Sequence, residues 1–211
     1  MVYKILQISR DVRIAIDENK TSEQLLAEED VDTLSLDEII RSKILEAVRR
    51  VHTDAPPYML EGGHHFGDAI YWESLNSGWV ILPRDFMRLI VFRMTDWERP
   101  VYTAIDTYDP DYEKQSSRFR GIRGTAQKPV CVIAIRPEGR VLEFYSCKSE
   151  NAQVAQAVYA PLPFIDADGG IDICPRCYES IVYMAAALVC TTLSEGDKAA
   201  AFTELAKSAL Q

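Results

Sequence analysis

The sequence predicts an α+β fold in which helices at both ends of the chain flank a central antiparallel β-sheet. Apolar residues recur at three- and four-residue steps in the N-terminal third and again after residue 172, which is typical of helices that face a core. Between residues 79 and 160 the segments are shorter and rich in β-formers. Because helices and strands are segregated along the chain, this order favours α+β over a parallel doubly wound sheet.

The length of 211 residues and the hydrophobic content of 47% are sufficient for a buried core. We expect a single domain over residues 1–211, with a helical part formed by 1–60 and 172–210 and a β-rich part formed by 79–160. Five cysteines are an odd number, and a chain of this size needs no disulfide framework, so reduced thiols are expected. The apolar stretches are too short to span a membrane, and the N-terminus lacks secretory features, which predicts an intracellular protein with no membrane partner.

Two N-terminal helices are predicted, with a shorter one between them. The first has an apolar stripe formed by Ile5, Ile8, Val12 and Ile16. Thr21-Ser22 predicts the cap of the short helix, which an acidic connection follows. The clearest helix begins after Ser35, because Ser35 and Glu38 have the spacing of a capping box. The prolines at 56 and 57 end it.

The central strands are predicted from β-rich segments that turn residues separate. Residues 136–140 form a hairpin turn between two of them, residues 112–116 a helical turn, and the glycines at 121 and 124 a loop. The predicted strands are 79–82, 86–94, 101–105, 130–135, 141–145 and 154–159.

A C-terminal helical pair is predicted to pack with the N-terminal helices. The turn at 166–170 precedes the first helix of the pair, and residues 194–197 cap the second, which runs to Leu210. One side of the first helix carries Ile181, Met184, Ala185, Leu188 and Val189.

Charge is segregated along the chain, whose formal net charge is −9. The first 61 residues hold 13 acidic and 8 basic residues, whereas 11 of the 23 basic residues lie between Arg84 and Arg140. An acidic chain is not expected to coat nucleic acid over its whole surface. Local basic patches remain compatible with this balance.

The sharpest local motif is Cys174-Pro175-Arg176-Cys177 at a predicted helix start. Thiolates placed there would face free N–H groups, which lowers the thiol pKa and suits redox chemistry. Only 34 residues follow the motif, however, and a thioredoxin-like domain needs several strands and helices there. A thiol-dependent redox enzyme using Cys174 and Cys177 is therefore the alternative, and two small, partly buried side chains are the simpler interpretation.

The sequence predicts no metal site and no cofactor. Zinc would need two further ligands at suitable spacing, whereas Cys131 and Cys147 are placed in predicted strands and Cys190 on an apolar helix face. The acidic turns at 109–111 and 166–169 lack the glycine or the bidentate glutamate that a calcium loop requires. Both are explained as turns.

A basic loop is predicted around Gly121 and Gly124, with Arg118, Arg120 and Arg123. It could hold a phosphate, so a nucleic-acid-binding module is a further alternative. Phosphate-clamping loops of this kind join two helices, whereas a strand follows here, which favours a surface loop that contacts a protein partner. No catalytic motif is present, and no enzyme is predicted.

An ordered series of motifs begins with Gly78-Trp79-Val80-Ile81-Leu82-Pro83-Arg84-Asp85-Phe86-Met87-Arg88-Leu89. It continues through Met94-Thr95-Asp96-Trp97-Glu98-Arg99-Pro100-Val101, Tyr112-Glu113-Lys114-Gln115, Gly124 to Val130, Leu142-Glu143-Phe144-Tyr145 and Leu193 to Ala199. In this order the motifs resemble those of the head–tail connector (adaptor or neck) proteins of tailed bacteriophages, and the resemblance covers residues 35–210.

This resemblance implies a non-catalytic structural protein that forms a ring beneath the portal. The expected partners are further copies of the chain in the virion and the portal and tail proteins, with incidental contact to DNA in the channel. The expected location is the virion, and the bacterial cytoplasm before assembly. Among the residues themselves, Arg84, Arg88 and Arg99 are the first candidates for partner contacts, because arginine is enriched at interfaces. The large residues Trp72, Trp79, Trp97 and Phe86 are expected in the core.

Overall fold

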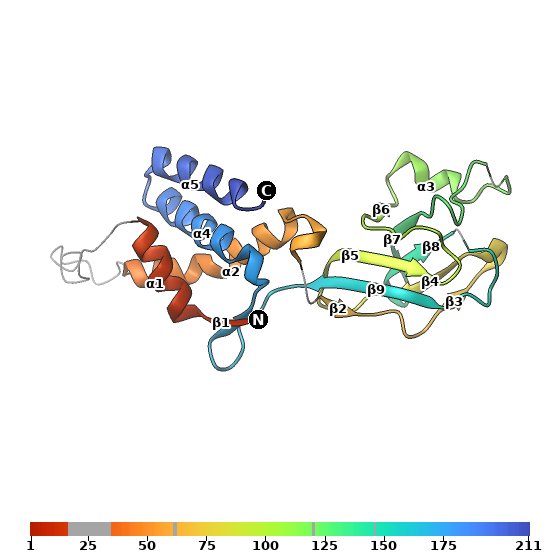
Figure 1. Ribbon diagram of the computed structural model, residues 1–211, viewed down its shortest axis with the longest axis horizontal. Helices are drawn as coiled ribbons and strands as arrows, with labels where there is room; N and C mark the ends of the chain where they lie inside the picture. Colours follow the sequence, from red (N-terminus) through yellow and green to blue (C-terminus); the bar gives the residue numbers. More distant parts are fainter. Residues whose placement is uncertain (17–34, 61–62, 120, 146) are drawn as a thin grey trace. The chain divides into compact units, whose positions relative to one another are not determined.

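The protein divides into two compact units, which are described separately. The computed structural model describes residues 1–16, 35–60, 63–119, 121–145 and 147–211. The helical unit contains Met1–Glu61 and Leu162–Gln211, and the β unit contains Gly62–Pro161 (Figure 1). The α+β class is confirmed. The two units match the predicted helical and β-rich parts in content, and the assignment of both to a single domain stays a prediction.

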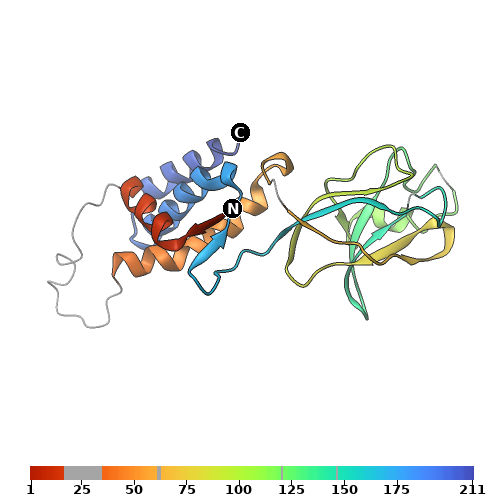
Figure 2. The same cartoon turned by 60° about the horizontal axis from the view of Figure 1, so that its bottom comes forward.

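The helical unit is built around α4, which packs against α1, α2 and α5 (Figure 2). Ile181, Ala185 and Val189 are buried as the periodicity predicted, and Ala186, Ala187 and Cys190 are buried as well. Alanines allow such close helix packing because their side chains add little width. The elements of this unit are β1 (Val2–Lys4), α1 (Ile5–Ile16), α2 (Leu36–Asp54), η2 (Pro57–Met59), β10 (Gly170–Asp172), η4 (Pro175–Cys177), α4 (Tyr178–Thr192) and α5 (Gly196–Ser208).

The predicted helix starts and ends are mostly confirmed. The Ser35 hydroxyl accepts from the Glu38 backbone N–H at 3.3 Å, and the Ser35 backbone N–H donates to the Glu38 carboxylate at 2.8 Å, which completes the capping box. α2 ends at Asp54, immediately before Ala55 and the prolines. The predicted short helix near Thr21 lies outside the described residues.

Two details of the C-terminal helices differ from the prediction. α5 ends at Ser208, so Leu210 lies beyond the helix, because Leu210 has entered a closing turn. Glu195 occupies the cap position without a side-chain hydrogen bond to the backbone, and it forms an ion pair with Lys198 at 3.0 Å instead. The predicted C-terminal pair is present: α4 packs on the N-terminal helices α1 and α2 as predicted, and α5 packs on α4.

The β unit consists of two sheets. One has the order β2-β9-β5, and the other has the order β3-β4-β8-β7-β6. The elements are β2 (His64–His65), β3 (Tyr71–Trp72), η3 (Ser74–Asn76), β4 (Gly78–Ile81), β5 (Phe86–Met94), β6 (Ile105–Asp106), α3 (Pro110–Lys114), β7 (Cys131–Arg136), β8 (Gly139–Phe144) and β9 (Val154–Pro161).

Strand pairing confirms the hairpin and corrects one strand. β7 and β8 pair antiparallel, and Gly139 has a φ of +126°, which only glycine adopts readily. The predicted strand 101–105 is wrong, because Val101 forms only an isolated bridge to Phe92 and the strand there is β6. β6 pairs parallel to β7, so the five-stranded sheet is mixed.

An aromatic core lies between the two sheets of the β unit. It takes Phe92 from β5 and Tyr159 from β9 on one side, and Phe144 from β8 on the other. Ring centroids lie 5.7 Å apart for Phe92 and Trp97 and 6.0 Å apart for Phe92 and Phe144. The expected core positions of Phe86, Trp79 and Trp97 are confirmed, and Trp72 is partly buried.

Alternation along β8 creates a second face on the five-stranded sheet. Leu142 and Phe144 point into the aromatic core, so Val141 and Glu143 point to the opposite face. There Val141 joins Trp79 and Ala134 in a small separate cluster. The connection between β6 and β7, which contains α3, runs beside these strands and leads to the candidate site (Figure 1).

Candidate partner-binding surface

The connection from β6 to β7 begins with a well-capped short helix. Asp109 accepts from the Asp111 backbone N–H at 2.8 Å, and Pro110 occupies the first turn of α3, where its missing N–H costs nothing. Asp106 accepts from the Tyr108 N–H at 2.7 Å in the preceding turn. These local bonds fix where the chain enters α3.

The loop that follows α3 is closed at its base by one buried amide. Gln115 is buried, and its side-chain NH₂ donates to the Asp111 carbonyl at 2.8 Å while its side-chain oxygen accepts from the Gly124 N–H at 2.8 Å. The next turn is closed by paired backbone bonds between Thr125 and Lys128. We call residues 115–128 the arginine loop; residue 120 within it lies outside the described residues.

The arginine loop exposes apolar side chains between its arginines. Phe119 is 73% exposed and Ile122 is 52% exposed, and the Ile122 N–H donates to the Phe119 carbonyl at 3.0 Å. Arg118 is exposed, and Arg123 is partly buried nearer the base. The loop therefore presents an aromatic and an aliphatic group on a locally folded backbone.

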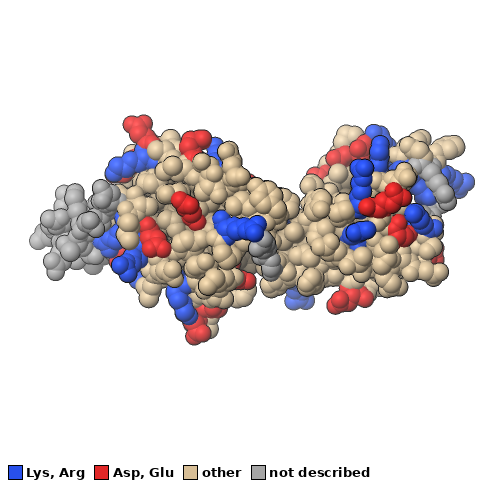
Figure 3. All heavy atoms as spheres, in the orientation of Figure 1, with Lys and Arg blue, Asp and Glu red and all other residues tan. Residues whose placement is uncertain are grey.

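Charge within the arginine loop itself is of one sign. Residues 115–128 contain four basic residues and no acidic residue, in a chain whose net charge is −9. Outside the loop, α3 and its cap carry Asp109, Asp111 and Glu113, and Figure 3 shows acidic and basic side chains side by side over this part of the β unit. Such a patch attracts acidic groups of a partner.

A cavity of about 450 Å³ lies at the base of the arginine loop. Arg123, Thr125 and Gln127 line it from the loop, and Glu98 and Lys148 line it from neighbouring segments. The Lys148 ammonium lies 3.8 Å from the Glu98 carboxylate, so this wall carries both signs of charge. The cavity places Arg123 in a recess, whereas Arg118 belongs to the exposed part of the loop.

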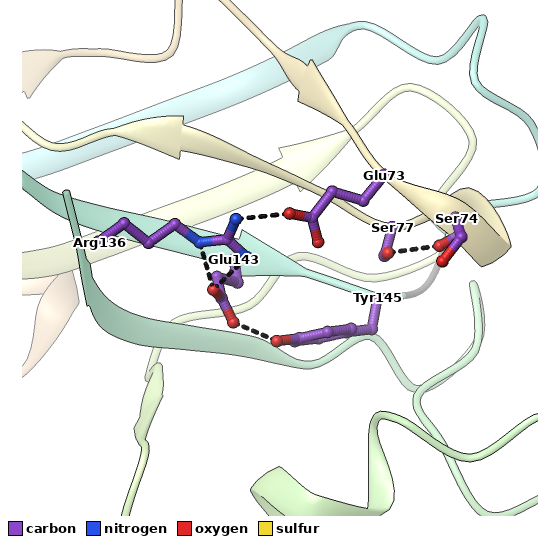
Figure 4. Close-up of polar contacts among 6 residues, drawn as sticks. All are labelled: Glu73, Ser74, Ser77, Arg136, Glu143 and Tyr145. Carbon is purple, nitrogen blue, oxygen red and sulfur yellow. Dashed lines mark hydrogen bonds and ion pairs between the residues drawn. The ribbon is translucent and has the colours of Figure 1, made fainter. Parts of the chain in front are cut away.

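A buried polar network supports the sheet beneath the connection (Figure 4). Glu143 is 3% exposed, and its carboxylate accepts from the Arg136 guanidinium at 2.7 Å and from the Tyr145 hydroxyl. Arg136 also pairs with Glu73. Burial raises the pKa of Tyr145, with the Glu143 carboxylate and the hydroxyl of Tyr112 adding to it.

The same guanidinium stacks on an aromatic pair. Arg136 lies 5.2 Å from the Trp79 ring centroid, and Trp79 stacks on Tyr71 with centroids 4.1 Å apart and planes at 9°. The hydrogen bond to Glu73 is the largest contribution that raises the pKa of Arg136. Trp79 and Glu143 are cross-strand partners, so stack and network share one face of the sheet.

Only some of the arginines predicted to contact a partner lie together in the structure. Arg118 and Arg123 share one loop, as the sequence indicated, and Arg120 lies outside the described residues. Arg84 is exposed in the turn between β4 and β5, Arg88 is partly buried in β5, and Arg99 is exposed in the connection after β5. These three come from separate segments of the β unit.

The Cys174 and Cys177 environment differs from the one that redox chemistry required. Both thiols are buried, and both sulfur atoms face the carbonyl of Met59, at 3.9 Å for Cys177. Neither caps a backbone N–H of η4 or α4. Burial raises the pKa of Cys177 to about 12, with Cys174 adding to the shift, so the thiolate form of Cys177 is disfavoured.

The other cysteines occupy different surroundings. Cys131 is buried in β7, and Cys190 is buried in α4 as predicted. Cys147 follows β8 and lies outside any strand, which corrects its predicted placement. Burial, followed by the Asp96 carboxylate, raises the pKa of Cys147 to about 12. Among the described residues, no three His, Cys, Asp or Glu side chains form a group that could hold a metal ion.

Three functional features were missed by sequence reasoning. Gln115 closes the arginine loop, Glu143 accepts hydrogen bonds from Arg136 and Tyr145, and Trp79 stacks with the Arg136 guanidinium. Glu143 sits in a strand where alternation alone does not distinguish a solvated carboxylate from a buried one. No local pattern identifies Gln115, because its partner Gly124 is nine residues away.

These features define an α+β protein with an exposed basic and apolar loop on a two-sheet β unit. No helix in the described part of the chain combines the length and apolar content needed to cross a membrane. Neither a known family nor a curated protein was found to match the chain.

Proposed function

We propose that this protein is a structural component of the head–tail junction of a tailed bacteriophage or prophage, where copies form a ring beneath the portal. The observation that carries the proposal is the arginine loop, with Phe119 and Ile122 exposed beside Arg118. The order of motifs from Gly78 to Ala199 supports the choice of this class. The role is assembly by protein contacts and involves no catalysis.

The composition of the arginine loop suits a protein partner. Aromatic residues and arginine are enriched at the centres of protein interfaces, and exposed apolar groups gain by leaving water. Gln115 fixes the base of the loop through two hydrogen bonds, so less conformational entropy is lost on docking. The loop can therefore bind without first having to fold.

A second apolar surface lies on the helical unit. Leu6 and Ile14 are exposed on α1, and they are eight residues apart, which places them on one face of the helix. A head-to-tail ring requires two different surfaces on every copy. The α1 face and the arginine loop supply two such surfaces on one chain.

Binding to the portal tests this proposal directly. The portal protein encoded in the same genome is mixed with the purified chain, and sedimentation velocity measures co-migration. We expect co-migration for the unchanged chain and its loss in Phe119→Ser and Arg118→Glu, which alter exposed side chains. Arg49→Glu, an exposed position on α2, is the charge-matched control and should retain binding.

Two outcomes count against this function. Absence of co-migration for the unchanged chain under all salt conditions would refute portal binding. Tight, strongly salt-dependent binding of single-stranded DNA that needs Phe119 would instead favour the nucleic-acid alternative, because aromatic residues stack on bases and cations bind phosphates. Neighbouring genes provide a further check, since portal, capsid and terminase genes are expected beside this one.

A further inference from the structure

The chain carries two segments of opposite charge. Residues 17–34 contain seven acidic residues and one basic residue, whereas the arginine loop contains four basic residues and no acidic residue. The acidic segment belongs to the helical unit, between the end of α1 at Ile16 and the cap of α2 at Ser35. The basic segment belongs to the β unit.

We propose that residues 17–34 of one copy bind the arginine loop of a second copy. This inference rests on the proposed ring and names the contact between neighbouring subunits. The partner of the exposed loop is then an acidic segment of the same protein. Every copy carries both halves of the contact, the acidic segment and the arginine loop. Such a contact is heterologous, the type that closes into rings.

The acidic segment also has apolar residues to offer. Leu25, Leu26, Val31 and Leu34 are interspersed among its acids. Phe119 and Ile122 are interspersed among the arginines in the same way. The two segments are therefore complementary both in charge and in apolar content, which a purely acidic run would not be.

The position of the segment limits how it can reach a partner. Its two ends are fixed in the helical unit, because Ile16 is buried at the end of α1 and Ser35 is held in the capping box. Eighteen residues lie between these points. Ile14 is exposed on the last turn of α1.

Charge complementarity also reduces the repulsion between copies of an acidic chain. Copies with a net charge of −9 repel one another, and the repulsion opposes ring formation. A local pairing of opposite charges offsets this repulsion and selects one relative orientation. Because salt screens exposed charges over about 10 Å at 0.1 M, the contact should weaken as salt rises.

Zero-length cross-linking between copies tests the contact. Carbodiimide joins carboxylates to amines, and Lys128 supplies an exposed amine in the arginine loop. Copies labelled with ¹⁵N and unlabelled copies are mixed, treated both free at high concentration and assembled on portal, and analysed by mass spectrometry. We expect mixed-isotope links between Lys128 and the acids of residues 17–34, and Lys128→Arg should remove them while keeping the charge.

Charge reversal supplies an independent readout. Arg118→Glu with Lys128→Glu, or Glu28→Lys with Glu29→Lys, should each weaken self-association by about tenfold. Combining both pairs in one chain should restore it. In a mixture of the two single-segment variants, each variant repels further copies of itself, whereas both contacts between the two variants join unlike charges. The mixture should therefore associate, with the two variants alternating.

The outcomes separate this inference from the proposed function. Rings that form on portal without links from Lys128 to residues 17–34 overturn the inference and leave the function intact. If every cross-link joins two peptides of the same isotope, the links form within one copy, and this result overturns the contact between copies. Mixed-isotope links in the free protein, together with no binding to portal, support the contact and remove the head–tail assignment.

Discussion

The helical unit and the β unit differ in how they bury polar groups. In the helical unit α4 is enclosed by apolar contacts, and its buried Ser180 hydroxyl donates to the Ala206 carbonyl at 2.8 Å. In the β unit a carboxylate, a guanidinium and a phenol are bonded to one another at Glu143. One unit is therefore held mainly by helix packing, and the other also depends on charge that is paired across strands.

The two units can be followed separately by spectroscopy. Trp72, Trp79 and Trp97 are the three tryptophans of the chain, and all lie in the β unit. The long helices lie in the helical unit, so tryptophan fluorescence follows one unit and far-UV circular dichroism mainly the other. Each prediction below should change one signal more than the other.

The largest effect is expected in the aromatic core of the β unit. Phe92 is fully buried against Phe66, Trp97 and Phe144, so Phe92→Ala should reduce the free energy of unfolding of this unit by about 3–5 kcal/mol. Denaturant titration followed by tryptophan fluorescence measures it. Ile135→Ala, at a position 85% exposed, is the control and should be nearly neutral.

Acid should destabilise the helical unit through His52. Burial lowers the pKa of His52 from 6.5 to about 4, and Asp172 partly opposes the shift. Above pH 6.5 the imidazole is neutral in both states, and between pH 6.5 and about 4 the unfolded chain alone binds the proton. About 3 kcal/mol of stability should be lost across this window.

Circular dichroism at several pH values checks the His52 prediction. His52→Gln removes the titrating group, so its stability should vary less with pH than that of the unchanged chain between pH 6.5 and 4. An equal pH dependence in both proteins would assign the acid sensitivity to other groups.

Removing the buried carboxylate should have an intermediate effect. Glu143→Gln removes the charged acceptor that Arg136 and Tyr145 share, leaving Arg136 with Glu73 alone, and should cost about 1–3 kcal/mol because both donors lose a strong, buried partner. The pKa of Tyr145 should also fall, since the nearby negative charge is gone. Fluorescence-detected unfolding and spectrophotometric titration of tyrosine measure the two effects.

Glu73→Gln is the matched comparison for Glu143. Glu73 also pairs with Arg136 but is more exposed, so its loss should cost less than about 1 kcal/mol. Equal costs for the two variants would contradict the idea that burial makes Glu143 the anchor of the network.

The smallest effect is expected at the capping box of α2. Ser35→Ala removes the side-chain acceptor of the Glu38 N–H and should cost about 1 kcal/mol, seen by circular dichroism and not by fluorescence. Ser42→Ala lies within the same helix, where the hydroxyl only bonds the Ile39 carbonyl, and should change stability little. A larger loss at Ser42 than at Ser35 would contradict the assignment of the cap.

The same contrast explains what the sequence could predict. α2 was predictable because its cap and apolar stripe are local, and β5 was predicted over its full range from β-formers alone. β6 was not predictable, because it is short and its parallel partner is distant in sequence: β7 starts 26 residues after Ile105. Non-local pairing leaves little trace in neighbouring residues.

The candidate site was predictable in part for the same reason. Arg118, Arg123 and the glycines marked a basic loop, but the buried Gln115 that closes it and the recess around Arg123 depend on tertiary contacts. The Cys174 and Cys177 spacing was visible, whereas the Met59 carbonyl that both sulfur atoms face comes from a distant segment. The spacing alone therefore suggested reactive thiols, which the surroundings of the two cysteines do not favour.

Electron microscopy of the chain assembled with its portal tests the central claim most directly. The proposed function predicts a closed ring of this protein beneath the portal, with the arginine loop at the contact between neighbouring subunits. Phe119→Ser should abolish the ring, and Arg49→Glu should preserve it. Portal particles that carry no added ring, together with virions that join heads to tails without this protein, would contradict the account.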